Sequence, residues 1–127
     1  MKKLKRILYV EDEPDIQAIA NIALETVGGF HIKICSSGEE ALVNAVAFMP
    51  DLFLLDVMMP GMDGPSTLEA LREIPELDGI PVIFMTAKVQ PTEISEYEAL
   101  NALGIIAKPF DPMKLAEQIE IIWQQSN

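Results

Sequence analysis

Hydrophobic residues alternate between two periods along this chain. Five short apolar runs contain mainly Ile, Val, Leu and Phe and few charges, which is typical of strands covered on both faces of a sheet. These runs lie at residues 7–10, 31–35, 52–55, 81–85 and 104–107. Between them lie segments with the period of a helix that buries one face. Five repeats of strand then helix predict an α/β fold, with a parallel sheet covered by helices on both sides.

Local signals mark the first two helices. An apolar stripe defines the first helix, and Gly28-Gly29 is expected to end it, because glycine suits the conformation at a helix C-terminus. Ser37 is the predicted N-cap of the second helix, because Glu40 follows three residues later as in a capping box. The stripe of the first helix consists of Ile16, Ile19, Ala20, Ala23, Leu24 and Val27, and Ile22 lies outside it.

The other three helices differ in the strength of their signals. The third is predicted to begin near Gly64-Pro65 and to end before Pro75. The fifth is predicted to begin with Asp111 as N-cap and Pro112 as its first helical residue. The fourth begins near Pro91 and has a weak apolar pattern, so we expect it to be the least firmly packed helix.

Size and composition indicate one folded domain. The chain has 127 residues, of which 50% are hydrophobic, enough for a single domain with its core at about 5–124. No output domain is expected, because the sequence contains no helix-turn-helix pattern. Cys35 is the single cysteine and lies in an apolar run, so we expect a buried core residue and a reducing compartment, the cytoplasm.

The charge distribution excludes two classes of partner. The formal net charge is −11, and the basic residues are concentrated in the first six positions. The acidic remainder argues against binding to nucleic acid or to an anionic membrane surface. No apolar stretch approaches the roughly 20 residues of a membrane-spanning helix, so membrane insertion is not expected.

Glu11, Asp12, Asp56, Thr86 and Lys108 follow four of the five apolar runs. In parallel sheets, ligands bind beside the carboxyl ends of the strands, and these residues all fall at that edge. An ionised carboxylate at the end of a buried strand is unfavourable unless a cation or a proton compensates it. The pattern therefore predicts one site for a metal ion and a phosphoryl group, built from Glu11, Asp12, Asp56, Thr86 and Lys108.

Each of these residues also has an ordinary structural explanation. Asp56 suits a helix cap, although the glycines after it favour a loop. The triplet 11–13 suits a solvated helix start, and Glu13 is assigned that role. Thr86 suits a strand for its β-branched side chain, and Lys108 suits a solvated surface position. Convergence on one edge of the sheet favours the functional interpretation.

The sequence resembles the receiver domain of two-component response regulators. The resemblance covers nearly the whole chain and implies the flavodoxin-like fold, a doubly wound three-layer sandwich with a five-stranded parallel sheet. The strand order 2-1-3-4-5 is taken from this resemblance. The matching segments, in the order and spacing of the family, are Tyr9–Pro14, Leu54–Gly64, Phe84–Lys88 and Ala107–Phe110.

The resemblance implies a divalent cation, Mg²⁺ or Mn²⁺. Asp12 and Asp56 would bind the cation directly, and Glu11 would contribute through water or by orientation. The backbone carbonyl of Met58 would be a further ligand. A few carboxylates together with waters and phosphate oxygens are the usual ligands of Mg²⁺.

The resemblance also assigns the phosphoryl chemistry. Asp56 would accept the phosphoryl group as an acyl phosphate. Lys108 would pair with Asp56 and then neutralise the phosphoryl charge, and Thr86 would hydrogen-bond a phosphoryl oxygen. The Lys108–Pro109 peptide bond is expected to be cis by resemblance, although only about 5% of such bonds are cis in folded proteins.

One position departs from the family pattern. Receiver domains commonly carry Tyr or Phe three residues before the conserved lysine, and this chain has Ile105. In the family, that ring turns inward as the threonine hydroxyl moves toward the phosphoryl group. We therefore expect a switch that is muted, or one that is carried by the loop after Thr86 and by the fourth helix.

These expectations define a signalling phospho-acceptor that promotes its own phosphorylation and dephosphorylation and is not a turnover enzyme. The donor would be a histidine kinase or a histidine phosphotransfer protein, docking near the first helix and the loop after Lys108. The effector is an unknown protein. Ile121 and Trp123 are candidates for an effector or weak homodimer patch, although isolated exposed apolar residues are common.

Two alternatives remain open at this stage. One is an interaction module that keeps the receiver fold without being phosphorylated. The other is a Mg²⁺-dependent phosphatase with an aspartate nucleophile. Such enzymes commonly have a second carboxylate two residues after the nucleophile, where this chain has Met58, and a capping insertion for which there is no room.

Overall fold

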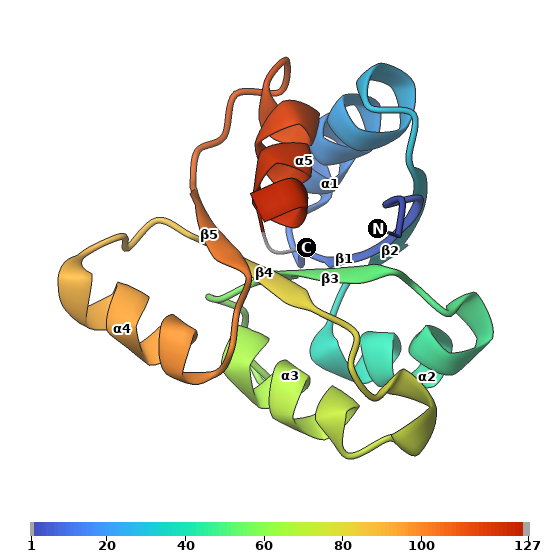
Figure 1. Ribbon diagram of the computed structural model, residues 1–127, viewed down its shortest axis with the longest axis vertical. Coiled ribbons are helices and arrows are strands. Elements are labelled where there is room, and N and C mark those ends of the chain that lie inside the picture. Colours follow the sequence, from blue (N-terminus) through green and yellow to red (C-terminus); the bar gives the residue numbers. More distant parts are fainter. Residues whose placement is uncertain (1, 126–127) are drawn as a thin grey trace.

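A parallel five-stranded sheet forms the middle layer of the computed structural model, which describes residues 2–125 (Figure 1). The strand order is β2-β1-β3-β4-β5, which confirms the predicted topology. The strands end within one residue of the predicted positions. They are β1 (Arg6–Val10), β2 (His31–Cys35), β3 (Leu52–Asp56), β4 (Val82–Thr86) and β5 (Gly104–Ala107).

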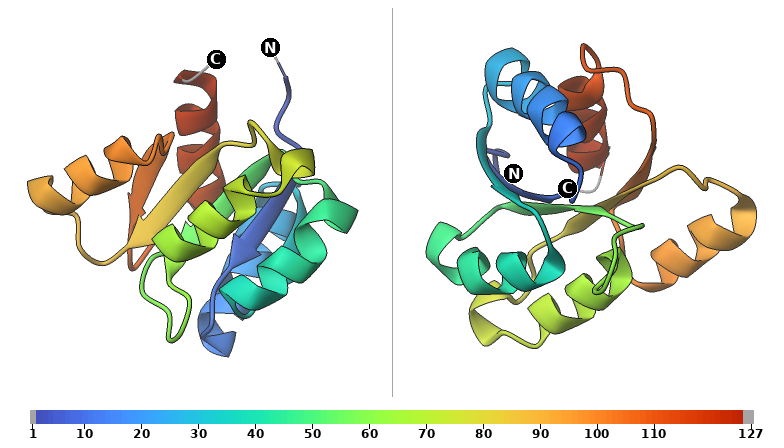
Figure 2. Two further views of the ribbon diagram at one scale, coloured as in Figure 1. Left: turned by 90° about the horizontal axis from the view of Figure 1, so that it is seen from below. Right: turned by 180° about the vertical axis from the view of Figure 1, so that it is seen from behind.

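Helices cover both faces of the sheet, as Figure 2 shows. One outer layer contains α1 (Pro14–Asn21), its continuation η1 (Ile22–Val27), and α5 (Leu115–Gln125). The other contains α2 (Gly38–Phe48), α3 (Gly64–Arg72), the short 3-10 helix η2 (Pro75–Leu77) and α4 (Pro91–Ala99). None of the helices within residues 2–125 is long and apolar enough to cross a bilayer.

Alternate residues of the strands build two separate cores. Tyr9 and Leu54 belong to the core beneath α1 and α5, whereas Leu8 and Leu55 belong to the core beneath α2, α3 and α4. This alternation follows from the two-residue period of a strand. Cys35 is buried and unpaired in the second core, as predicted.

The first helix differs from its predicted pattern. The regular α-helix ends at Asn21, and Ile22–Val27 continue it as a π-helix. Ala20 and Leu24 are buried as predicted, but Ile19 and Val27 are 45% and 46% exposed. A π-helix turns less per residue than an α-helix, so the assumed 3.6-residue period misplaces Val27. The prediction of a fully buried stripe is wrong at these two positions.

Hydrogen bonds to backbone donors explain where two helices begin. Ser37 Oγ accepts from the Glu40 backbone amide at 3.1 Å, which confirms the predicted N-cap of α2. The Glu40 carboxylate accepts from the Ser36 amide instead of completing the capping box at Ser37. Asp63 Oδ1 caps α3 in the same way, accepting from the Ser66 amide at 2.8 Å.

Two predictions for the last helix are wrong. Residues 112–114 form a turn, and α5 begins at Leu115 instead of Pro112. Asp111 Oδ1 accepts from the Met113 amide at 2.9 Å, so Asp111 caps this turn. Trp123 is buried and its Nε1 donates to the Lys2 carbonyl at 2.9 Å, which removes it from the predicted surface patch and leaves Ile121 exposed.

The weak apolar pattern of α4 corresponds to weak burial. Tyr97 is the one buried residue of this helix, at 5% exposure. Its ring lies against Phe84 of β4, with ring centroids 5.2 Å apart. A single aromatic side chain therefore holds α4 on the sheet, which confirms that it is lightly packed.

Tyr97→Ala should lower the free energy of unfolding by about 2–4 kcal/mol, because a buried ring is lost without replacement. Amide hydrogen exchange should increase most in α4, because no other side chain there is buried. Val43→Ala is the control, since Val43 of α2 is 80% exposed and its truncation should change stability by less than about 0.5 kcal/mol. Uniformly distributed exchange changes in Tyr97→Ala would contradict this view of α4.

Candidate functional site

The carboxyl ends of four strands bring the predicted site residues together. Val10 of β1 pairs with Leu55 of β3, so Glu11 and Asp56 occupy neighbouring positions at the ends of adjacent strands. Thr86 of β4 pairs with Ala107 of β5, which places Lys108 at the same edge. Parallel pairing thus converts a sequence separation of nearly one hundred residues into direct contact.

Lys108 links the two buried carboxylates of the site. Its Nζ lies 3.2 Å from Asp56 Oδ1 and 3.0 Å from Glu11 Oε1. The side chains of Glu11 and Asp56 are almost inaccessible to solvent. Charge-assisted hydrogen bonds of this kind are the strong ones in a protein interior. The predicted pairing of Lys108 with Asp56 is present, and Glu11 takes part in it.

Glu11 is held by several groups at once. Its Oε1 accepts from Tyr9 Oη at 3.2 Å as well as from Lys108, and its Oε2 accepts from the Glu13 amide at 3.2 Å. The Glu11 carbonyl also accepts from the Gln17 side chain on α1. These contacts fix the orientation of a carboxylate that is fully buried.

The environment of Asp56 raises its pKa to about 6. Burial is the main cause and the Glu11 charge adds to it, while Lys108 opposes both. For Lys108, burial lowers the pKa, but hydrogen bonds and charges from Glu11 and Asp56 outweigh burial and raise it overall. Lys108 therefore remains a cation, and Asp56 becomes predominantly anionic as the pH rises above about 6.

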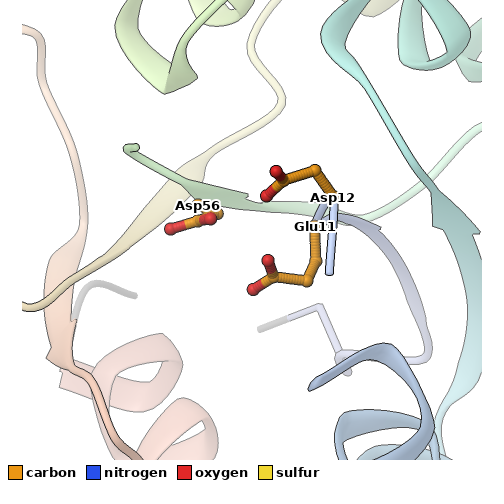
Figure 3. A group of neighbouring side chains, drawn as sticks. All are labelled: Glu11, Asp12 and Asp56. Carbon is orange, nitrogen blue, oxygen red and sulfur yellow. The ribbon is translucent and has the colours of Figure 1, made fainter. Parts of the chain in front are cut away.

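Three carboxylates are close enough to share a cation. Glu11, Asp12 and Asp56 each offer an oxygen, and these oxygens lie within 4.8 Å of one another. Figure 3 shows Glu11 and Asp12 at the end of β1 facing Asp56 at the end of β3. Hard carboxylate oxygens are the ligands that Mg²⁺ prefers, so the donor set fits the expected cation.

Thr86 and Met58 follow the same edge of the sheet, since Thr86 ends β4 and Met58 lies two residues after Asp56 at the end of β3. Thr86 is buried, and its Oγ1 accepts from the Lys88 amide at 3.0 Å, which leaves the hydroxyl hydrogen available to donate. The side chain of Met58 is 62% exposed, in the loop that follows Asp56. The ligand role of the Met58 carbonyl stays a prediction.

The loop between β3 and α3 requires glycine at Gly64. A Cβ atom there would lie 2.6 Å from the Asp56 carbonyl oxygen, closer than real Cβ atoms approach. The Gly64 amide donates to the Val57 carbonyl at 3.1 Å, which holds the start of α3 against the end of β3. A side chain at position 64 would therefore displace the backbone that carries Asp56.

At position 105, where the family commonly has an aromatic residue, an aliphatic side chain packs against the core. Ile105 is partly buried and packs against the core that contains Phe84 and Tyr97. Phe84 and Thr86 are two residues apart on β4 and therefore share a face of the sheet. The Lys108–Pro109 peptide bond is cis.

Sequence reasoning missed the contribution of Tyr9. Tyr9 belongs to an apolar run and to the first segment that matches the family, yet its hydroxyl also contacts Glu11. The available signal was the spacing, because residues two apart in a strand point to the same face. A tyrosine two positions before a buried acid can therefore hydrogen-bond it.

Asp56→Asn should change how stability depends on pH. Because the pKa of Asp56 is about 6 in the folded protein and usually 3.8, the folded protein binds the proton more tightly than the unfolded chain. Its stabilising contribution is therefore complete below pH 3.8 and is lost as the pH rises to about 6. Relative to wild type, Asp56→Asn should gain stability over this interval, on the order of 1 kcal/mol after solvent screening.

Urea unfolding in EDTA across that pH interval measures this difference. Asp78→Asn is the matched control, because Asp78 is exposed and lies outside the site. A stability difference between Asp56→Asn and wild type that stays constant with pH would contradict the raised pKa.

Comparison with known proteins places this arrangement in a family. A sequence model of the response regulator receiver domain matches residues 7–120. The alkaline phosphatase synthesis transcriptional regulatory protein PhoP of Bacillus subtilis is 34% identical over 122 residues, covering 96% of this chain and 50% of that protein. The phosphate regulon transcriptional regulatory protein PhoB of Rhizobium meliloti is 30% identical and covers 97% of this chain and 54% of that protein. The chain thus spans about half the length of these curated relatives.

Solved structures show the same likeness. The chemotaxis protein CheY4 of Vibrio cholerae superposes with a TM-score of 0.86 at 27% identity, covering 94% of this chain and 99% of that one. The N-terminal domain of a response regulator receiver protein from Methanoculleus marisnigri is 41% identical, with a TM-score of 0.75 and coverage of 94% and 96%. From its fold and its match to the family model, the chain belongs to the response regulator receiver domain family.

Proposed function

We propose that this receiver domain accepts a phosphoryl group on Asp56 in a Mg²⁺-dependent reaction. One observation carries the proposal: Asp56 is buried between the Lys108 ammonium group, 3.2 Å away, and two further carboxylates. A buried, partly neutralised carboxylate beside a cation site has the features that an aspartyl phosphate acceptor needs.

The transfer exchanges one phosphorus bond for another. An Asp56 carboxylate oxygen attacks the phosphorus of a phosphohistidine, the P–N bond breaks, and the imidazole leaves with the electron pair and takes up a proton. Hydrolysis later returns the carboxylate and releases inorganic phosphate. Bound Mg²⁺ would supply positive charge to the phosphoryl oxygens and would be held by Asp12 and Asp56, with Glu11 beside it.

The protein's own residues provide charge and position. Lys108 would leave Asp56 for the phosphoryl group as the Asp56 oxygen becomes bonded to phosphorus, while its hydrogen bond to Glu11 keeps it at the site. The Thr86 hydroxyl would donate to another phosphoryl oxygen. Since the pKa of Asp56 is about 6, most of the carboxylate is ionised at neutral pH and can act as the nucleophile.

The phosphoryl donor is proposed to be a histidine kinase or a histidine phosphotransfer protein. Its histidine must reach Asp56, so it would dock beside α1 and the loop after Lys108. Such a partner would cover two exposed apolar side chains, Ile22 directly after α1 and Met113 in the loop after Lys108. The effector would be a protein, and the reducing cytoplasm suits the buried free thiol of Cys35.

The switch is proposed to act through the β4–α4 loop and α4. Thr86 precedes this loop, and α4 is held on the sheet by Tyr97 against Phe84. Displacement of Thr86 toward a phosphoryl group would disturb the adjacent Phe84 and thereby the single buried contact of α4. With Ile105 in place of the usual aromatic residue, Tyr97 would supply the ring that responds.

Incubation with acetyl phosphate and Mg²⁺ should add one phosphoryl group to the wild-type chain, as measured by intact mass. EDTA should abolish this gain, and so should Asp56→Asn, because the nucleophile is lost. Asp78→Asn should be phosphorylated like wild type, because Asp78 is exposed and outside the site.

Thermal melting without acetyl phosphate tests cation binding separately. Mg²⁺ should raise the melting temperature of wild type by mass action, and less so in Asp12→Asn. A phosphoryl group gained equally by Asp56→Asn would contradict the acceptor assignment. Absence of both phosphorylation and a Mg²⁺-induced stabilisation would favour a module that acts without phosphorylation.

Phosphorylation should change amide hydrogen exchange mainly in residues 87–99, if the loop and α4 carry the switch. Ile105→Tyr should alter this response, because the added ring would compete with Tyr97 for the space beside Phe84. Hydrogen-exchange mass spectrometry of both proteins, with and without phosphorylation, measures the difference. The same response in wild type and Ile105→Tyr would remove support for this switch.

A further inference from the structure

We propose that Tyr9 is a positioning residue of the phosphoryl-acceptor site, whose hydroxyl moderates Glu11 and thereby keeps Lys108 transferable between Asp56 and the phosphoryl group. This inference rests on the function proposed above. It adds a residue in the interior of β1 to the polar groups at the strand ends. Tyr9 would act through Glu11 and would contact neither the phosphoryl group nor the cation.

Tyr9 is completely buried in the core beneath α1 and α5. The remaining residues of β1 that are fully buried, Ile7, Leu8 and Val10, carry no polar side-chain atom. The Tyr9 hydroxyl donates to Glu11 Oε1 at 3.2 Å. The ring thus contributes to the core, and its hydroxyl reaches the charged cluster at the end of the same strand.

The contact falls on the oxygen that also holds Lys108. Glu11 Oε1 accepts from Tyr9 Oη and from Lys108 Nζ, and Lys108 Nζ contacts Asp56 Oδ1 in turn. These contacts form one chain from Tyr9 to Asp56. The other Glu11 oxygen is engaged by the Glu13 amide.

A neutral donor on Glu11 changes how strongly that carboxylate attracts cations. A hydrogen bond to a charged group is stronger than one between neutral groups, so the hydroxyl stabilises a share of the Glu11 charge. With the hydroxyl present, Glu11 holds Lys108 less tightly than an otherwise bare buried carboxylate would. The Lys108 ammonium group can then move from Asp56 to the phosphoryl group as the negative charge on Asp56 is lost.

Removal of the hydroxyl should therefore have two opposite effects. In Tyr9→Phe the Glu11 carboxylate has one donor fewer and attracts nearby cations more strongly. Mg²⁺ should bind about 3- to 10-fold more tightly, within the range set by one hydrogen bond to a charged group. Lys108 should be drawn closer to Glu11 and should contact the phosphoryl group less well, so the phosphorylation rate at saturating Mg²⁺ and acetyl phosphate should fall by a similar factor.

The opposite signs distinguish positioning from a merely structural role. If Tyr9 only filled the core, Tyr9→Phe would retain the ring and change neither quantity, or distortion would weaken both. Tyr97→Phe is the matched control, because it removes a hydroxyl in the other core and keeps the ring that packs against Phe84. It should leave both quantities at wild-type values.

The test uses calorimetric titration with Mg²⁺ and single-turnover phosphorylation of wild type, Tyr9→Phe and Tyr97→Phe. In a Glu11→Gln background, Tyr9→Phe should no longer change Mg²⁺ affinity, because the charge that the hydroxyl moderates is absent. Tyr9→Met is the second hydroxyl-free variant should Tyr9→Phe fold poorly in a thermal melt.

The outcomes separate the two proposals. Tighter Mg²⁺ binding with slower phosphorylation in Tyr9→Phe supports the inference, whereas unchanged values or weakening of both overturns it. An effect on Mg²⁺ affinity that persists in Glu11→Gln also overturns it. If wild type is not phosphorylated on Asp56, the proposed function fails, and the Mg²⁺ titration alone decides the role of Tyr9 in moderating Glu11.

Discussion

This site depends on one ionic arrangement, in which two buried carboxylates share a single lysine. Glu11 and Asp56 stand at the ends of adjacent parallel strands, and Lys108 contacts both. Without that cation, two anions would lie in the interior with a third, Asp12, beside them. The parallel sheet creates the crowding because its strands end at one edge, and the Lys108 side chain at the end of β5 compensates part of it. The negative charge that Lys108 leaves uncompensated is the reason we propose a divalent cation at this site.

The site consists of polar side chains at the strand ends and of a second set of residues that support them. The first set consists of strand-end residues whose oxygens and ammonium group face one another, as seen for Glu11, Asp12 and Asp56 in Figure 3. The second set supplies the backbone and core contacts that fix their positions, such as Gly64 beneath the Asp56 backbone and Tyr9 beneath Glu11. Site geometry therefore depends on residues that carry out no chemistry.

Much of this arrangement follows from local patterns in the sequence. Apolar runs separated by helical periods specify the strands, and polar residues at the run ends specify the site, because parallel strands must end together. The strand order came from family resemblance, since alternation alone does not determine which strands are neighbours. Residues at strand ends were predictable because their positions depend on topology more than on packing detail.

Features that depend on side-chain packing were not predictable in the same way. A π-helix after Asn21 exposes Val27, and the period of an ideal helix contains no information about that change. Trp123 was a candidate for a surface patch with Ile121, but it is buried beside the N-terminal segment, to which its indole donates. The hydroxyl of Tyr9 was overlooked because a single aromatic residue within an apolar strand resembles ordinary core.

Helix α4 lies on the surface and packs against the sheet through few buried side chains. Tyr97 is its one buried side chain and packs on Phe84, which shares a sheet face with Thr86. In the proposed switch, a small displacement of Thr86 would pass through Phe84 and Tyr97 to a helix with no other buried side chain. With the aliphatic Ile105 beside it, this aromatic pair is the ring contact between β4 and α4.

A crystal structure of the chain with Mg²⁺ and beryllofluoride, a stable mimic of a phosphoryl group, tests the shared-lysine arrangement most directly. We expect beryllium bonded to an Asp56 oxygen, with Lys108 Nζ moved onto a fluoride and still hydrogen-bonded to Glu11. Beryllofluoride bound away from Asp56, or Lys108 separated from both the fluorides and Glu11, would contradict the assignment of these residues.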